Sequence, residues 1–174
     1  MEETTVSIIG IMIAALLMFV VPLVTIADRN DDISQLTAQT LTADFVDKIV
    51  RLGQITSDDY NEYVTRLASS GNTYDIEIEV KILDENPSIT TTDGNKNTIG
   101  SNLYYSIFTS QIEEKFKTND KIILKEGDVV SVVAKNSSKT VSQTLKSFYY
   151  TVKGEDLHII SSTSTATVAV NGTT

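Results

Sequence analysis

An uncharged run of apolar residues near the start of the chain constrains the fold more than any other feature. Residues 6–27 (VSIIGIMIAALLMFVVPLVTIA) contain no charged side chain, and Ile, Leu, Val, Met and Ala dominate. At about 1.5 Å per residue, a helix of this length can cross a hydrocarbon layer of about 30 Å. Such a segment ends up in a bilayer, in a cleaved signal peptide or in the core of an assembly.

The charges that flank this run do not match a secretory signal peptide. Glu2 and Glu3 precede it, and Asp28, Arg29 and further aspartates follow it. A signal peptide carries basic residues in front of a shorter apolar core. We therefore expect the run to be kept in the working protein as a helix.

The helical pattern continues past the apolar run. We predict one helix over residues 1–53, apolar at 6–27 and amphipathic at 31–52, with Gly53 as its C-terminal cap. Pro22 lies inside the apolar part, where it removes one backbone hydrogen bond and loosens the helix. The apolar stripe expected to pack on the rest of the chain consists of Ile33, Leu36, Leu41, Phe45, Ile49 and Leu52.

Residues 54–174 are expected to form an α+β head. The segment ITSDDYNEYVTRLASSG (55–71) predicts a helix capped by Thr56 or Ser57 and finished before Gly71. The segment TYDIEIEVKIL (73–83) alternates strictly between apolar and charged residues, which predicts a strand with one buried face. That face is the expected cover for the amphipathic helix.

The rest of the head is predicted from weaker patterns. We expect a helix over 102–117, with Tyr104, Phe108, Ile112 and Phe116 in one row, and two strands on either side of a turn at 125–128. Residues 137–148 are either a short helix or a loop, and 149–153 and 157–170 are expected to be strands. The predicted fold class is α+β: an antiparallel sheet of about four to six strands with the long N-terminal helix and short helices packed on it.

Composition and motifs argue against several classes of function. The net charge of −9 is unfavourable for nucleic-acid binding, and the absence of cysteine excludes disulfides and thiolate metal sites. The single histidine, His158, has no partner residue nearby in sequence, and the adjacent Glu113 and Glu114 diverge on a helix. Asp93, Asn95 and Asn97 alternate as in a calcium loop, but we expect an exposed loop there. We predict no enzyme activity, no cofactor and no metal.

The first fifty or so residues resemble the type IV pilin superfamily, including its tight-adherence and pseudopilin-like members. The similarity rests on the apolar N-terminal helix, the acidic residues at its start, Pro22 and the amphipathic continuation before a β-containing head. In that family a dedicated peptidase removes a leader, which would make Met1 the first residue of the processed chain. The family's glutamate at mature position five, which neutralises a neighbouring subunit's terminal amine, is Thr5 here, with Glu2 and Glu3 as candidate replacements.

The resemblance implies a structural subunit of an extracellular pilus-like filament. The subunit would reside in the membrane first and then pack against copies of itself. The residues expected in the filament core are Glu2, Glu3, Ile8, Ile9, Ile11, Ile13, Leu16, Leu17, Phe19, Val20, Pro22 and Leu23. Two alternatives remain at this point: a single-pass anchor that carries an extracellular binding or secretion-apparatus domain, and a minor subunit of a filament made by another protein.

Overall fold

A computed structural model describes residues 2–84, 103–153 and 159–173 of the chain. Its elements, in chain order, are α1 (Glu2–Leu52), β1 (Gln54–Thr56), α2 (Ser57–Ala68), β2 (Tyr74–Leu83), β3 (Tyr104–Phe108), α4 (Thr109–Thr118), β4 (Lys121–Ile123), β5 (Val129–Asn136), α5 (Val141–Lys153) and β6 (Ser161–Thr167). The predicted α+β class, with one long N-terminal helix and an antiparallel sheet, is confirmed.

The main sheet has four antiparallel strands in the order β3-β2-β5-β6. Val80 of β2 lies at its centre, opposite Val130 of β5 on one side and Ile107 of β3 on the other. The alternation in β2 is realised as predicted, because Ile78 and Val80 are buried while Asp75 and Glu77 are exposed. The short strands β1 and β4 pair separately as a two-stranded antiparallel sheet.

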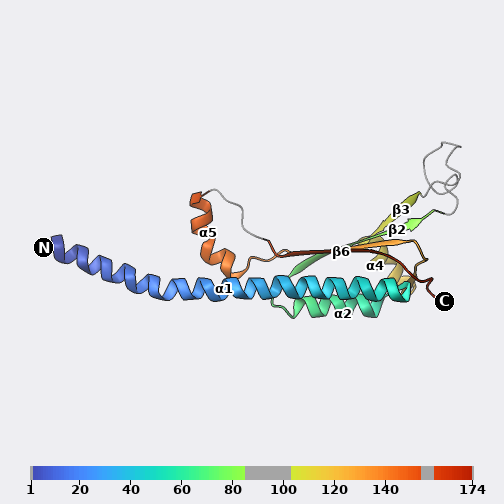
Figure 1. The fold of residues 1–174 in the computed structure, drawn as a ribbon, viewed down its shortest axis with the longest axis horizontal. Helices are drawn as coiled ribbons and strands as arrows, with labels where there is room; N and C mark the ends of the chain where they lie inside the picture. The colour runs from blue at the N-terminus through green and yellow to red at the C-terminus, as the bar shows by residue number, and fades with distance from the viewer. Residues whose placement is uncertain (1, 85–102, 154–158, 174) are drawn as a thin grey trace.

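The second half of α1 packs mainly over β6 and β5, rather than over β2 as expected from the sequence. Figure 1 shows the sheet lying along this half of the helix, with α2 folding back beside it. The buried positions of α1 include Ala27, Ser34, Ala38 and Thr42, and β6 presents small residues such as Ser162. Small side chains on both elements allow the helix and strand backbones to approach closely.

The predicted apolar stripe of α1 is therefore only partly correct. Phe45 and Ile49 are buried, but Ile33 and Leu36 are each 64% exposed and Leu52 is 46% exposed. The predicted stripe consists of large apolar residues throughout, whereas over residues 34–42 the buried positions of α1 are the small residues Ser34, Ala38 and Thr42. Ile33 and Leu36 consequently point to solvent on a part of the helix that is attached to the head.

Helix α2 begins and ends where the sequence predicts. Thr56 caps its N-terminus by accepting a hydrogen bond from the Asp59 amide at 3.1 Å, and Asp58 and Asp59 occupy its positive first turn. Tyr63 stacks on Phe45 of α1, with ring centroids 4.4 Å apart and an interplanar angle of 2°. This contact joins α2 to α1 within the hydrophobic core.

Helix α1 ends at a close contact with the C-terminal segment. Gly53 has φ +64° and donates its amide to the Ile49 carbonyl at 2.8 Å, as expected of a helix-terminating glycine. Its carbonyl accepts from Leu124, and a Cβ on Gly172 would lie 2.1 Å from this same oxygen. Glycine at position 172 is therefore required for the C-terminal segment to pass across the end of α1.

Two predicted segments have a different structure. Residues 102–117 are not one helix, because Tyr104–Phe108 forms strand β3 on the edge of β2 and α4 begins only at Thr109. Residues 149–153 are not a strand but the last part of α5. The predicted strands on either side of the 125–128 turn are present as β4 and β5, but they belong to different sheets. His158 and the Asp93–Asn97 segment lie outside the described residues.

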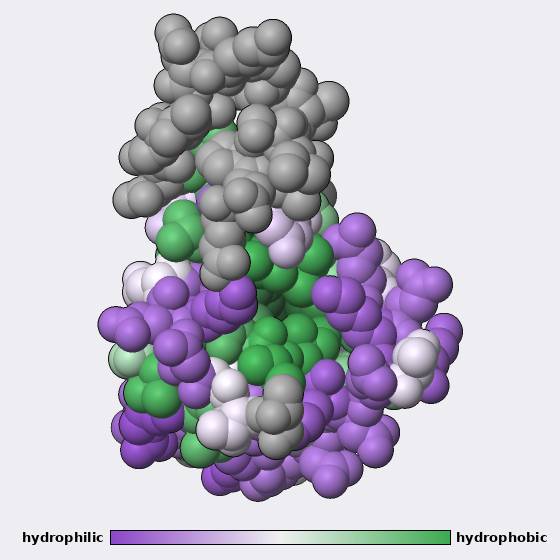
Figure 2. Space-filling model, turned by 90° about the vertical axis from the view of Figure 1, so that its right-hand side faces the viewer, coloured by the Kyte–Doolittle hydropathy of each residue, from purple (hydrophilic) through white to green (hydrophobic). Residues whose placement is uncertain are grey.

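The molecule is elongated, with the head at one end (Figure 1). The N-terminal part of α1 projects far beyond the sheet, and α5 stands off α1 at a steep angle near the point where this projection begins. Figure 2 views the molecule from the head end, opposite the N-terminus of α1. It shows hydrophobic residues at the centre of this face within a rim of hydrophilic ones. The buried residues of α1, α2, α4 and the strands form one hydrophobic core in the head, whereas the most apolar part of α1 has no buried residue.

Candidate functional site: the projecting part of α1

The projecting part of α1 exposes large apolar side chains on all of its sides. The expected assembly residues that are more than half exposed are Ile8 (59%), Ile9 (52%), Ile11 (70%), Ile13 (54%), Leu16 (62%), Leu17 (51%), Phe19 (72%) and Leu23 (55%). Val20 is partly exposed and Pro22 is exposed. Because exposed apolar surface of this extent is costly in water, this segment requires a lipid or protein environment.

The two N-terminal glutamates fall within the first turn of α1. The Glu3 side chain is exposed. The backbone carbonyl of Glu3 accepts a hydrogen bond from the Ser7 hydroxyl at 2.9 Å. Negative charge at a helix N-terminus is favourable because the unpaired amides there carry partial positive charge. The Glu3 carboxylate is thus placed at the tip of the projection.

Pro22 loosens the helix without interrupting it. The residue lies within a continuous α1, but it has no amide hydrogen to donate to the carbonyl of Met18 one turn earlier. Nearby, the Thr25 hydroxyl donates to the Val21 carbonyl at 3.0 Å, a contact that favours slight bending of helices. Figure 1 shows a gentle curve in the projecting part of α1.

One exposed apolar series runs along α1 from the projection onto the head. Met12, Phe19, Ile26 and Ile33 are seven residues apart and are 68%, 72%, 64% and 64% exposed. Spacing of seven residues keeps side chains on nearly one face of a helix. Of these four residues, only Phe19 is among the assembly residues expected from the sequence, although the seven-residue spacing is visible there.

A polar junction holds α5 against α1 directly after the apolar run. The Lys146 ammonium lies 2.6 Å from one Asp28 oxygen, and Ser142 donates a hydrogen bond to the same carboxylate. One turn further along α1, Asp31 accepts a hydrogen bond from the Thr140 hydroxyl at 2.7 Å. The hydrogen bonds from Lys146 and then Ser142 lower the pKa of Asp28 below its ordinary value of 3.8.

Gln35 links the same region of α1 to the edge of the main sheet. Its side-chain amide donates to the Ser161 carbonyl at 2.6 Å, and its side-chain oxygen accepts from the Ser161 amide at 3.0 Å. Since β6 is an edge strand, these backbone groups face away from β5. The Gln35 side chain therefore makes the two backbone hydrogen bonds with Ser161 that a neighbouring strand would otherwise make.

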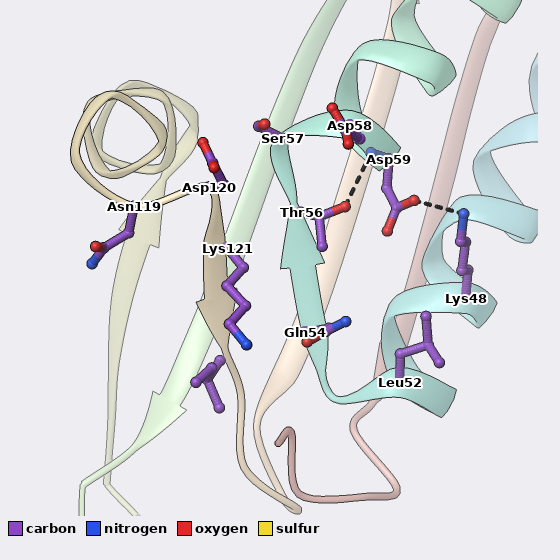
Figure 3. Close-up of a pocket in the computed structure, with 11 residues that line it drawn as sticks. Lys48, Leu52, Gln54, Thr56, Ser57, Asp58, Asp59, Asn119, Asp120 and Lys121 are labelled. Atoms are coloured by element: carbon purple, nitrogen blue, oxygen red, sulfur yellow. Dashed lines mark hydrogen bonds and ion pairs between the residues drawn. The ribbon is translucent and has the colours of Figure 1, made fainter. Parts of the chain in front are cut away.

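The head also contains an open groove of about 920 Å³ between α1, α2 and the small sheet (Figure 3). Its lining residues are Lys48, Leu52, Gln54, Thr56, Ser57, Asp58, Asp59, Asn119, Asp120, Lys121 and Ile123. Figure 3 shows Asp59 and Lys48 pointing toward one another, whereas Asp58 and Asn119 point elsewhere. The charged groups of the groove do not converge on a common point.

The central charges of this groove have structural roles. Lys48 and Asp59 form an ion pair at 2.6 Å that ties α1 to the start of α2. Burial acts to raise the pKa of Asp59, but hydrogen bonds from Lys48 and Thr56 outweigh it and leave this pKa below 3.8. Among the described residues, no group of three or more His, Cys, Asp or Glu side chains could hold a metal ion. The groove is therefore a weaker candidate for a functional site than the exposed face of α1.

By length and composition, α1 is compatible with membrane insertion. It is the one helix of the described chain that is long and apolar enough to cross a bilayer, and its most apolar window has no buried residues. Comparisons with known protein families, with curated proteins and with solved structures give no match.

Proposed function

We propose that this protein is a structural subunit of an extracellular filament of the pilus type. In the assembled state, the apolar part of α1 packs against the same helix of neighbouring copies, and the heads form the outer surface. Before assembly, residues 6–27 hold the subunit in a membrane. The apolar side chains exposed on all sides of the projecting part of α1 support this proposal, because both environments would cover them.

The observation that carries the proposal is the exposure of Ile33 and Leu36. Both lie beyond Asp28 and the following aspartates, so a bilayer that holds residues 6–27 would not cover them. A neighbouring α1 would cover them, because Ile33 continues the seven-residue series of Met12, Phe19 and Ile26. Helix packing along this series accounts for apolar surface that a plain anchor leaves in water.

Glu2 and Glu3 are suited to fix the axial position of one subunit relative to its neighbour. A carboxylate at the tip of one α1 can neutralise a terminal amine or another cation on an adjacent subunit inside an apolar core. An unpaired charge would be costly there, so the pairing would favour one axial offset between neighbours. Pro22 fits the same setting, since a loosened helix can adjust its curvature to its neighbours.

A second candidate function is a single-pass anchored domain with a binding or secretion-apparatus role. The observation in its favour is the length of the uncharged run, which matches one bilayer crossing and ends at charged residues on both sides. In this case the head would act alone, and the groove between α1, α2 and the small sheet would be its candidate binding surface.

The double variant Ile33→Ser/Leu36→Ser separates these two functions. Loss of two large apolar contacts between subunits costs more than about 1.4 kcal/mol, so the sedimentable filament fraction should fall by about tenfold or more. Membrane insertion should be unchanged because both positions lie outside residues 6–27.

Gln39→Ser is the matched control for this double variant. Gln39 is exposed on the same helix, about 120° around it from Ile33, and its replacement by serine removes no apolar side chain. The control should assemble like the natural chain. Normal assembly of the double variant would contradict the filament proposal.

A further inference from the structure

Helix α5 is attached to α1 at the level where a bilayer surface would lie. Its contacts with Asp28 and Asp31 fall within about 6 Å of the end of the apolar run at Ala27, given the rise of an α-helix. The headgroup region of a bilayer adds about 5–8 Å to each side of the hydrocarbon core. If residues 6–27 span that core, the attachment of α5 lies in the headgroup region.

The orientation of α5 also matches this position. Figure 1 shows the axis of α5 rising steeply from that of α1. A helix that crosses a membrane-spanning helix in this way extends along the membrane surface rather than into the aqueous phase. The Asp28–Lys146 and Asp31–Thr140 contacts hold α5 at its N-terminal half in this orientation.

The exposed apolar residues of α5 lie on a different side of the helix from its buried ones. Ser142 and Lys146 face α1, and Gln143, about 100° further around the helix, is 8% exposed. Val141 and Leu145 lie about 100° around in the opposite sense and are 67% and 42% exposed. These two residues therefore present apolar surface that the rest of the described chain leaves exposed.

The charge of this segment differs from that of the rest of the chain. Residues 137–153 contain Lys139, Lys146 and Lys153 and no acidic residue, in a protein with a net charge of −9, although Lys146 is already paired with Asp28 of α1. Basic residues around an apolar face are typical of helices that bind at the surface of anionic membranes. The acidic remainder of the head would be repelled by such a surface, so α5 is the element suited to contact it.

We propose that α5 is an interfacial helix that rests on the anionic headgroup region of the membrane holding residues 6–27, with Val141 and Leu145 inserted among the lipids. This inference rests on the membrane residence of the unassembled subunit in the proposed function. The contact would fix the tilt and height of the subunit in the membrane. Assembly into a filament would then require α5 to leave the lipid surface.

Single-cysteine variants test the proposal, since the natural chain contains no cysteine. The full-length variants Leu145→Cys, Ser147→Cys and Leu17→Cys carry an environment-sensitive fluorophore in vesicles of phosphatidylcholine and phosphatidylglycerol. Ser147 is the matched control because it is exposed on α5 about 200° around the helix from Leu145. Quenchers are a lipid nitroxide placed near the headgroups for positions 145 and 147, a lipid nitroxide placed near the ends of the acyl chains for position 17, and aqueous iodide.

The expected result is that the label at 145 is quenched by the lipid nitroxide and protected from iodide, while the label at 147 shows the reverse. This lipid quenching at 145 should weaken in vesicles of phosphatidylcholine alone. Iodide quenching at 145, together with lipid quenching at 17, would overturn the α5 proposal but leave the anchored subunit intact. Protection of 145 from both quenchers would overturn it in favour of a second protein copy. Absence of lipid quenching at 17 would overturn membrane residence itself.

Discussion

The carboxylate of Asp28 on α1 and the ammonium of Lys146 on α5 lie 2.6 Å apart, at the boundary between the apolar run and the head. The same carboxylate also accepts a hydrogen bond from Ser142. One acidic side chain of α1 thus holds two residues of α5 that are a helical turn apart. This contact decides where α5 stands relative to the projecting helix.

Asp28→Asn should loosen α5 while leaving the head folded. The substitution removes the charge that pairs with Lys146, and an ion pair between partly exposed groups contributes less than about 1 kcal/mol. We expect faster hydrogen exchange in α5 and little change in the unfolding midpoint of the head. Asp32→Asn, at an exposed position of the same helix, is the control. Equal exchange in both variants would contradict the role given to Asp28.

The same junction should weaken in acid. The pKa of Asp28 is lowered by the hydrogen bonds from Lys146 and Ser142, so its contribution to stability is complete above the ordinary value of 3.8 and is lost as the pH falls through the lower, folded value. The protection factors of α5 amides should therefore stay constant above about pH 5. They should decrease once the pH is lower than 3.8, the ordinary pKa of the Asp28 carboxyl. Asp28→Asn should abolish this pH dependence; its persistence in the variant would assign it to another group.

The hydroxyls of Thr42 and Tyr63 form a buried hydrogen bond of 2.9 Å between α1 and α2. Thr42→Val should reduce the free energy of unfolding by about 1–3 kcal/mol, because it leaves the Tyr63 hydroxyl buried without this partner. Tyr63→Phe should cost about 0.5–1.5 kcal/mol. Chemical denaturation of the double variant should show a smaller loss than the sum of the two, since both changes remove one shared bond. Additive losses would mean that the two hydroxyls are not coupled.

Gly172→Ala should destabilise the end of the head. Its Cβ would lie 2.1 Å from the Gly53 carbonyl oxygen, so the C-terminal segment has to move and lose the Gly172–Leu124 hydrogen bond. A loss of about 1–3 kcal/mol is expected in denaturant unfolding, as for other overpacked sites. Gly10→Ala is the control, because nothing lies within 4 Å of the added carbon. Equal stability of the two variants would refute the close contact.

The sequence correctly predicts those elements whose local residue pattern is compatible with only one backbone conformation. Strict alternation in β2 and the Thr56 cap of α2 each specify a conformation without reference to the rest of the chain. The end of α1 at Gly53 is of the same kind. The apolar run was equally clear, because 22 residues without a charge cannot be accommodated in a loop of the head.

The errors arose where tertiary contacts override local pattern. The aromatic row at Tyr104 and Phe108 has helical spacing, but pairing with β2 makes this segment a strand. Over residues 34–42 of α1, the buried positions are the small residues Ser34, Ala38 and Thr42, since close approach to β6 favours small residues over large ones. The attachment of α5 to Asp28 joins residues more than a hundred positions apart, so no local pattern could have predicted it.

Negative-stain electron microscopy of material sheared from producing cells, with mass spectrometry of the subunit, tests the filament proposal most directly. We expect thin filaments whose subunit is this chain, with the apolar part of α1 protected from protease and the N-terminal mass showing whether a leader has been removed. Recovery of the whole protein as single copies in the membrane fraction, with no filaments, would contradict it and favour the anchored domain.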